Sequence, residues 1–175
     1  MAGQAVVRAA RLNVVPYCAC SENHRRNHFF HWYSYRSLKH TIIGRQRWDL
    51  NVCCGRIDGG GPNSDIVKHD DIPNFVQLDN IYRLPFADAQ FEAVLCSHTV
   101  EHIDYPQRFD RELRRVGKNV VYILPPIWDL AAALNIREHK WLILSVRKVH
   151  RQLPPRVPLP FARRLQARIG QRISA

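Results

Sequence analysis

The sequence predicts a single α/β domain built on a mostly parallel sheet and followed by a basic helical tail. Three observations indicate this fold class. A chain of 175 residues with 46% hydrophobic content suffices for one domain with a buried core. Short strand-like apolar runs flank a helical pattern at the spacing of a parallel α/β unit. No apolar run approaches the roughly 20 residues that a membrane-spanning helix needs.

Five short segments carry the apolar, β-branched and aromatic residues that favour strands. They are residues 49–54, 65–70, 74–79, 91–97 and 119–124. The last two are mostly apolar, which is typical of strands buried on both faces of a parallel sheet. Only nine residues separate Gly55 from Asp65, whereas a parallel crossover normally needs about a dozen. We therefore expect the first crossover helix to be missing or reduced to a turn.

One helix is expected between the last two strands. Pro106 suits the first helical position, and Phe109, Leu113 and Val116 recur at i, i+4 and i+7 before Gly117. No clear pair of antiparallel strands follows the fifth strand. We therefore predict a sheet that is truncated after it.

The chain divides into four segments. Residues 1–47 are polar and mixed, with a helix expected at about 33–43. Residues 48–126 form the expected ligand-binding core, and residues 127–152 a largely helical cover. Residues 153–175 combine a proline-rich linker with a basic amphipathic helix.

Most of the net charge of +11 belongs to the C-terminal tail, which has nine Lys or Arg and no acid from His139 onward. Apolar residues recur there at every fourth position, with arginines between them. They are Phe161, Leu165, Ile169 and Ile173. Packing on its own domain is the default expectation for such a helix. Peripheral contact with an anionic membrane or with nucleic acid through residues 147–172 is the alternative.

The cysteines and histidines bear on the cellular compartment and on whether the chain binds zinc. Five cysteines and no secretory signal predict reduced thiols in the cytoplasm, with a peripheral membrane location left open. Five residues near the N-terminus have a spacing that could hold zinc, but no second well-spaced cysteine pair accompanies them. They are Cys18, Cys20, His24, His28 and His31. We assign no metal site.

Three segments carry a more specific signal. Residues 50–55 read LNVCCG, residues 84–94 read LPFADAQFEAV, and residues 97–103 read SHTVEHI. With the helix and strand that follow, they resemble the class I S-adenosylmethionine-dependent methyltransferases of the type 11 kind. The first motif departs from the family, because Cys53 and Ile57 stand where glycines are usual.

The resemblance implies a Rossmann-like sheet, S-adenosylmethionine as cofactor, and methyl transfer. We expect the acceptor to be an O or N atom of a small-molecule, sugar or lipid-linked compound. A catalytically inactive binding or scaffold protein is the first alternative. An RNA methyltransferase that uses the basic tail is the second. A homo-oligomer, in which a partner subunit completes the sheet, also stays open.

The resemblance also implies which residues bind the cofactor. They are Asn51, Cys53, Cys54, Gly55, Asp70, Asp79, Asn80 and Ser97. Asp70 would hold the ribose, with Asp65 and Asp71 as alternatives because the first loop is short. Asp79 and Asn80 would face the adenine.

Three residues are candidates for a general base: His98, Glu101 and His102. Methyl transfer is a displacement at a carbon already activated by positive sulfur. The protein therefore mainly positions the acceptor and, where needed, removes a proton. A histidine near a strand end often only hydrogen-bonds a neighbouring carbonyl, and Glu101 and His102 have orientation of the following loop as their alternative role.

Overall fold

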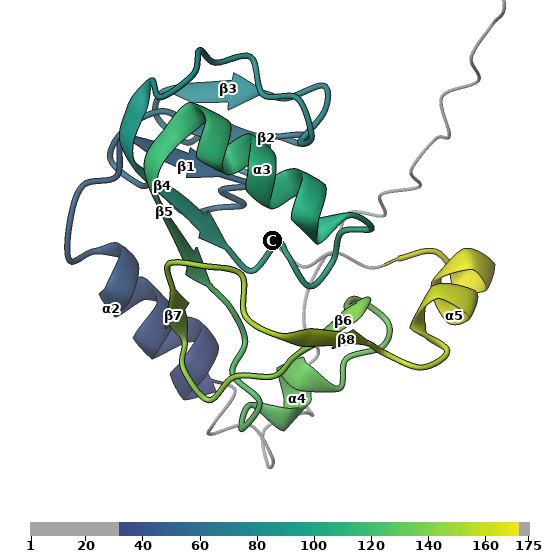
Figure 1. Cartoon of the computed structure of the whole chain (residues 1–175). Helices are drawn as coiled ribbons and strands as arrows, with labels where there is room; N and C mark the ends of the chain where they lie inside the picture. The colour runs from purple at the N-terminus through teal and green to yellow at the C-terminus, as the bar shows by residue number, and fades with distance from the viewer. Residues whose placement is uncertain (1–31, 172–175) are drawn as a thin grey trace, which may run out of the picture.

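The computed structural model describes residues 32–171 and contains one six-stranded sheet and one two-stranded sheet (Figure 1). The strands of the large sheet are β1 (Leu50–Val52), β2 (Asn63–Asp65), β3 (Phe75–Gln77), β4 (Phe91–Ser97), β5 (Gly117–Ile123) and β7 (Val149–His150). The small sheet pairs β6 (Trp141–Ile143) with β8 (Arg156–Pro158). The helical elements are the π-helix Tyr33–Leu38, α2 (Lys39–Ile43), α3 (Pro106–Val116), α4 (Leu130–Ala133) and α5 (Ala162–Ile169).

The large sheet has the order β3-β2-β1-β4-β5-β7. Every pair from β3 to β5 is parallel, whereas β7 runs antiparallel to β5. The mostly parallel, Rossmann-like class is therefore confirmed. The chain first builds outward from β1 to β3 and then returns to β4, so the strand order reverses between β1 and β4. Ligands of open α/β sheets bind beyond the carboxyl ends of the strands at such a point.

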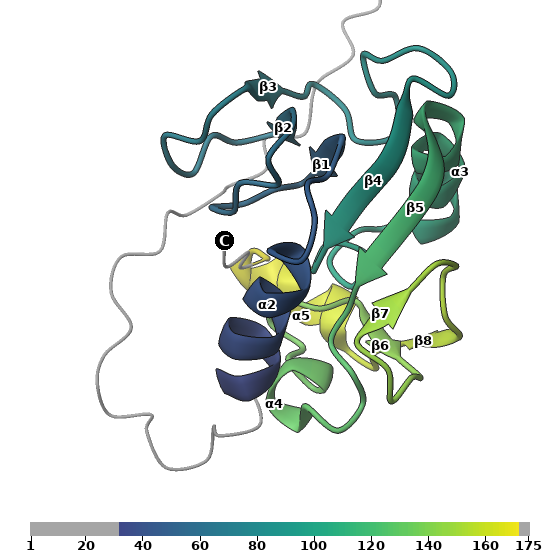
Figure 2. The same cartoon turned by 90° about the vertical axis from the view of Figure 1, so that its left-hand side faces the viewer.

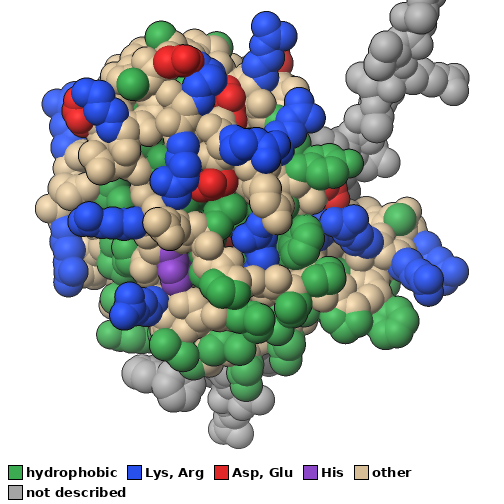
Figure 3. Space-filling model, in the orientation of Figure 1, with side chains coloured by type: hydrophobic (Ala, Val, Ile, Leu, Met, Phe, Trp, Pro, Cys, Tyr) green, Lys and Arg blue, Asp and Glu red, His purple; other side chains and the backbone are tan. Residues whose placement is uncertain are grey.

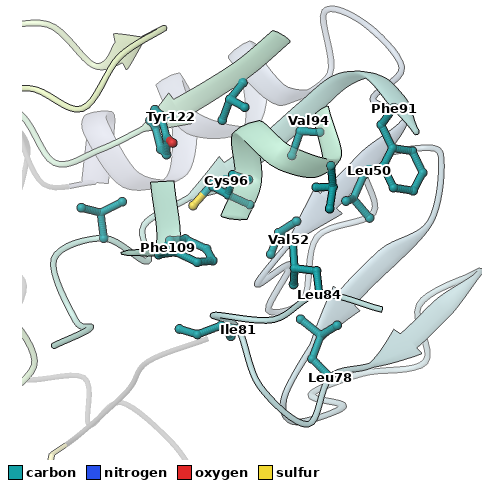
Figure 4. Packing of buried hydrophobic residues seen from close by; sticks show 14 of the residues in the cluster. Leu50, Val52, Leu78, Ile81, Leu84, Phe91, Val94, Cys96, Phe109 and Tyr122 are labelled. Atoms are coloured by element: carbon teal, nitrogen blue, oxygen red, sulfur yellow. The ribbon is translucent and has the colours of Figure 1, made fainter. Parts of the chain in front are cut away.

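A helix covers each face of this sheet (Figure 2). On one face α3 buries Phe109, Leu113 and Val116 against the sheet, as its spacing predicted. Figure 4 shows Phe109 among the core side chains of the central strands, including Cys96 and Val52. On the other face a smaller cluster forms where α2 and Trp48 contact β4 and β5.

The predicted absence of a first crossover helix is confirmed: residues 53–62 form a loop without one. Buried amides order this loop. The Asn63 Oδ1 accepts hydrogen bonds from Asn51 Nδ2 at 3.1 Å and from Gly59 N at 2.9 Å. Gly61 passes so close to the chain before β1 that an added Cβ would lie 2.4 Å from the Trp48 carbonyl oxygen. Side-chain hydrogen bonds and close backbone packing thus replace the helix.

Three expectations about the elements are wrong. The sheet is not truncated after β5, because β7 pairs with that strand through Tyr122–His150 and Ile123–Val149. The second strand ends at Asp65 rather than Asp70, since its pairing with β1 and β3 involves only Asn63–Asp65.

The third error concerns residues 127–152, which are not largely helical. They hold the four-residue α4 and then β6 and β7. The apolar run at 141–146 is too short for a helix and instead supplies β6, which pairs with β8. The predicted helices near 33–43 and 161–173 are present, the latter as α5. No helix among residues 32–171 is long and apolar enough to cross a membrane.

Candidate active site

A cavity of about 550 Å³ opens at the carboxyl ends of β1, β2 and β4, where the strand order reverses. This volume lies in the usual range for small-molecule sites. The strand ends contribute Cys53, Cys54, Gly55, Asp65, Ser97, His98 and Thr99. The helical segment before β1 contributes Tyr35, Arg36, Lys39 and His40, and the remaining wall includes Arg56, Ile57, Ile66, Val67, His69, Ile81, His102 and Ile103.

Two non-glycine residues at this edge adopt the left-handed backbone conformation. Cys53 follows β1 with φ 55°, and His98 follows β4 with φ 52°. Such conformations cost about 1–3 kcal/mol each and persist where the surroundings enforce them, often at functional sites. Gly55 reaches φ 58° without that cost. The two strands that flank the reversal point therefore both turn sharply into the cavity.

Asp65 is the acid that the structure places at the cavity. Its carboxylate accepts hydrogen bonds from Gly55 N at 3.0 Å and from Ile66 N at 2.7 Å, which fix its position at the end of β2. Asp70 and Asp71 are exposed and do not line the cavity, and Asp71 instead pairs with Lys68 at 2.8 Å. The structure therefore places Asp70 outside the cavity, because β2 ends earlier than predicted.

Three other predicted cofactor residues lie elsewhere. Asp79 and Asn80 are exposed outside the cavity, and Asn80 Oδ1 accepts a hydrogen bond from Tyr82 N at 2.8 Å. Ile81 lines the wall in their place. Asn51 is buried within β1, where its side chain orders the first loop instead of facing the cavity.

The remaining predicted residues do face the cavity. Cys53, Cys54 and Gly55 line it next to Ser97. Burial raises the pKa of Cys54 to about 12, so this thiol stays protonated at neutral pH. The Ser97 Oγ is buried at the cavity and has no hydrogen-bond partner among residues 32–171. A buried hydroxyl in that position is suited to a polar ligand atom.

His98 is held between an acid and a lysine. Its Nδ1 lies 3.1 Å from Glu101 Oε1, and its Nε2 lies 2.7 Å from Lys148 Nζ, which also donates to Ser34 Oγ at 3.0 Å. Burial, followed by the charge of Lys148, holds the pKa of His98 well below its ordinary value. Burial also lowers the pKa of Lys148 to about 7. The imidazole is therefore neutral, and its two nitrogens face neighbouring side chains.

Glu101 lies behind the cavity wall and does not line it. It is fully buried, and burial raises the pKa of its carboxyl group. Lys39 and Lys148 interact with this carboxylate through space. Glu101 therefore supplies negative charge to a buried cluster of basic groups.

Among the predicted bases, His102 lines the cavity, and a hydrogen bond fixes which of its ring nitrogens carries the proton. Its Nδ1 lies 3.0 Å from the Glu138 carbonyl oxygen, which can only accept, so Nδ1 carries the proton. The basic lone pair is then on Nε2. The ring also packs edge-on against His139, with centroids 4.7 Å apart.

Glu101, His102 and His139 also offer ligand atoms that lie within 4.8 Å of one another. These residue types bind divalent metals, but here the carboxylate already interacts with the amines of Lys39 and Lys148. We assign no metal site to this group. The zinc-like spacing at residues 18–31 lies outside the described part of the chain.

Sequence reasoning missed Lys39 and Lys148. A single lysine, in a helix like Lys39 or before an edge strand like Lys148, carries no sequence signal for burial, because lysines are mostly exposed. The sequence offers Asp65 as an alternative to Asp70 for holding the ribose. The choice between them depends on where β2 ends.

Comparison with known proteins relates part of the chain to a protein family. Residues 62–124 match the family model described as a methyltransferase domain. The resemblance to class I S-adenosylmethionine-dependent methyltransferases is thereby confirmed, and methyl transfer is supported as the general activity. The crystal structure of PH0226 protein from Pyrococcus horikoshii OT3 is similar, with 15% identity, a TM-score of 0.44, and alignment over 83% of this chain and 82% of that chain. No curated protein matches the sequence.

Proposed function

We propose that the chain transfers a methyl group from S-adenosylmethionine to an O or N atom of a small-molecule, sugar or lipid-linked acceptor. The observation that carries this proposal is the cavity at the strand-order reversal. It brings Gly55, Asp65 and Ser97 together beside His102, within or next to the segment that matches the methyltransferase model. The same position is where open α/β sheets bind their ligands.

The cavity residues fit the chemistry of this cofactor. Asp65 accepts two backbone hydrogen bonds, and its oxygens keep lone pairs for two ribose hydroxyls. Ile66 and Ile81 offer an apolar wall to the adenine, and Arg36 offers a cation to the methionine carboxylate. Gly55 allows close backbone approach to the methionine end. These assignments retain the predicted Cys53–Gly55 loop and replace Asp70 with Asp65.

The bound cofactor would supply a methyl group on positively charged sulfur. The remaining task for the protein is to orient the acceptor and remove its proton. We assign that proton transfer to His102, because Nδ1 is protonated and Nε2 is basic. His98 has a positioning role, since its nitrogens face Glu101 and Lys148.

Transfer of radioactive methyl groups tests this assignment. We would incubate the protein and methyl-labelled S-adenosylmethionine with separate lipid, small-molecule and RNA extracts. His102→Gln should reduce labelling by about 10²–10⁴-fold, while binding of S-adenosylhomocysteine stays within about twofold of the original. His150→Gln is the matched control, since His150 lies on the edge strand outside the cavity. Equal labelling by the two variants would exclude His102 as the base.

A catalytically inactive binding protein is the second candidate. It is favoured by the fact that, of the three predicted bases, Glu101 lies outside the cavity and His98 is engaged by Lys148. Tight binding of S-adenosylhomocysteine with no labelling of any extract would support it. Labelling confined to RNA would favour the RNA methyltransferase alternative.

A further inference from the structure

The helix α5 packs on the domain through a side that differs from the apolar stripe in its sequence. Ala162 and Gln166 are buried, and Gln166 Nε2 donates to the carbonyls of Ile136 and His139, both at 3.0 Å. Phe161 is 73% exposed, and Ile169 is 60% exposed. Gln166 thus faces the protein and Leu165 is half-buried, while Phe161 and Ile169 face outward.

Further apolar side chains are exposed on the neighbouring elements. Leu130 and Leu134, one helical turn apart around α4, are 63% and 57% exposed, and Val146 after β6 is 69% exposed. Figure 3 shows hydrophobic side chains gathered over the lower half of this face, where α4, β6, β8 and α5 lie in Figure 1. We call these five residues, Leu130, Leu134, Val146, Phe161 and Ile169, the apolar surface.

The charge on α5 itself is positive. The last acid of the chain is Glu138, and α5 alone carries three arginines, of which Arg164 and Arg168 are exposed and one turn apart beside the apolar stripe. In Figure 3 most of the visible Asp and Glu side chains lie over the upper part of the face. An anionic partner is therefore complementary to this region.

We propose that the apolar surface and the arginines of α5 dock on an anionic phospholipid bilayer. Exposed apolar patches mark interaction sites, and amphipathic helices with basic flanks lie in the boundary between headgroups and acyl chains. Phe161 and Ile169 would enter that boundary, and Arg164 and Arg168 would contact lipid phosphates. A nucleic acid would satisfy the arginines but would leave the exposed aliphatic side chains without a matching partner.

The backbone at Phe161 allows a sharp test. This residue has φ 61°, a left-handed conformation that is costly for a bulky side chain and free for glycine. Phe161→Gly therefore removes the apolar group while relieving strain. We expect its melting temperature to be no lower than that of the original protein, so that a loss of binding cannot result from unfolding.

Vesicle sedimentation measures the proposed docking. We would use the full chain with vesicles of phosphatidylcholine alone and of phosphatidylcholine with 30% phosphatidylserine. We expect binding to the anionic vesicles only, about tenfold weaker in Phe161→Gly and about fivefold weaker for each of Arg164→Gln and Arg168→Gln. Arg111→Gln, an exposed arginine on α3, is the matched charge control and should bind as the original does.

Other outcomes would overturn the proposal. Equal binding to both vesicle types, or unchanged binding by Phe161→Gly and Arg164→Gln, would show that this surface does not dock on anionic lipid. Binding to RNA that depends on Arg164 and Arg168, with no vesicle binding, would identify a nucleic-acid partner instead. Because sedimentation measures adsorption alone, its result is independent of methyl transfer.

Discussion

The helix α3 of the sheet core and the helix α5 of the C-terminal region bury different kinds of side chain. In the core, α3 buries Phe109 and Leu113 against the sheet. In the region after β5, α5 buries Gln166 and exposes Phe161 and Ile169. Both helices show apolar residues four apart. The spacing therefore predicts that a helix forms, whereas the side that is buried depends on tertiary contacts available only in the folded chain.

The polar groups buried by the C-terminal region support the site. Lys148 immediately precedes β7 and contacts His98 at the end of β4. Asp129 is buried as the cap of α4, where its Oδ1 accepts a hydrogen bond from Ala132 N at 3.2 Å. The region thus contributes polar contacts behind the cavity. Its exposed apolar side chains lie on the outer surface.

The largest expected effect is a difference in unfolding free energy between substitutions at a buried and at an exposed phenylalanine. Phe109→Ala should reduce the free energy of unfolding by about 3–5 kcal/mol, because it leaves a cavity in the core. Phe161→Ala should change it by no more than about 0.5 kcal/mol, since this side chain is exposed. Urea denaturation measures both. Similar losses in the two variants would mean that Phe161 is packed in the folded protein.

Substitution of one glutamine on each helix compares the contribution of buried and exposed polar side chains to the stability of α5 and α3. Gln166→Ala should cost about 1–3 kcal/mol, because the buried His139 carbonyl and the part-buried Ile136 carbonyl lose their side-chain donor. Gln107→Ala, on the exposed side of α3, should cost less than about 0.5 kcal/mol. The same denaturation measurement applies. A neutral Gln166→Ala would show that α5 does not depend on its polar contact.

Lys148 should give the C-terminal region a distinct pH dependence. Between pH 7, the pKa of the folded-state amine, and its ordinary value of 10.5, the unfolded chain binds a proton that the folded protein lacks. The free energy of unfolding should therefore rise with pH, by up to about 1.4 kcal/mol per pH unit from this group. Below pH 7 the amine is charged in both states and contributes no slope.

Lys148→Met should remove that contribution when unfolding is followed from pH 7 to 9. Lys118→Met, on the exposed part of β5, should keep the slope of the original protein. A Lys148→Met curve parallel to the original would contradict a neutral buried amine.

The difference between the two regions also explains what could be predicted from the sequence. The strands β1, β4 and β5 and the helix α3 follow from apolar runs and periodicity, since burial is their dominant stabilising interaction. The extent of β2 could not be predicted, because it depends on register with β1 and β3 rather than on composition. Its end decides that Asp65, and not Asp70, faces the cavity.

For the predicted catalytic residues, the sequence indicates their place in the fold but not their chemical role. The position after β4 correctly indicated that His98 and His102 face the cavity. Their different roles depend on Lys148 and on the Glu138 carbonyl, which come from distant parts of the chain. The helical cover expected at 127–152 is wrong because its apolar residues form short strands or stay exposed.

Calorimetric titration with S-adenosylhomocysteine tests the central claim most directly. The protein should bind this ligand with micromolar affinity. Asp65→Ala should lose at least about tenfold in affinity, as expected for a charged hydrogen-bonding group. Asp70→Ala, which removes the same charge from an exposed loop, should bind as the original does. Absence of binding at millimolar ligand, or an equal loss in the two variants, would contradict the assignment of this cavity to the cofactor.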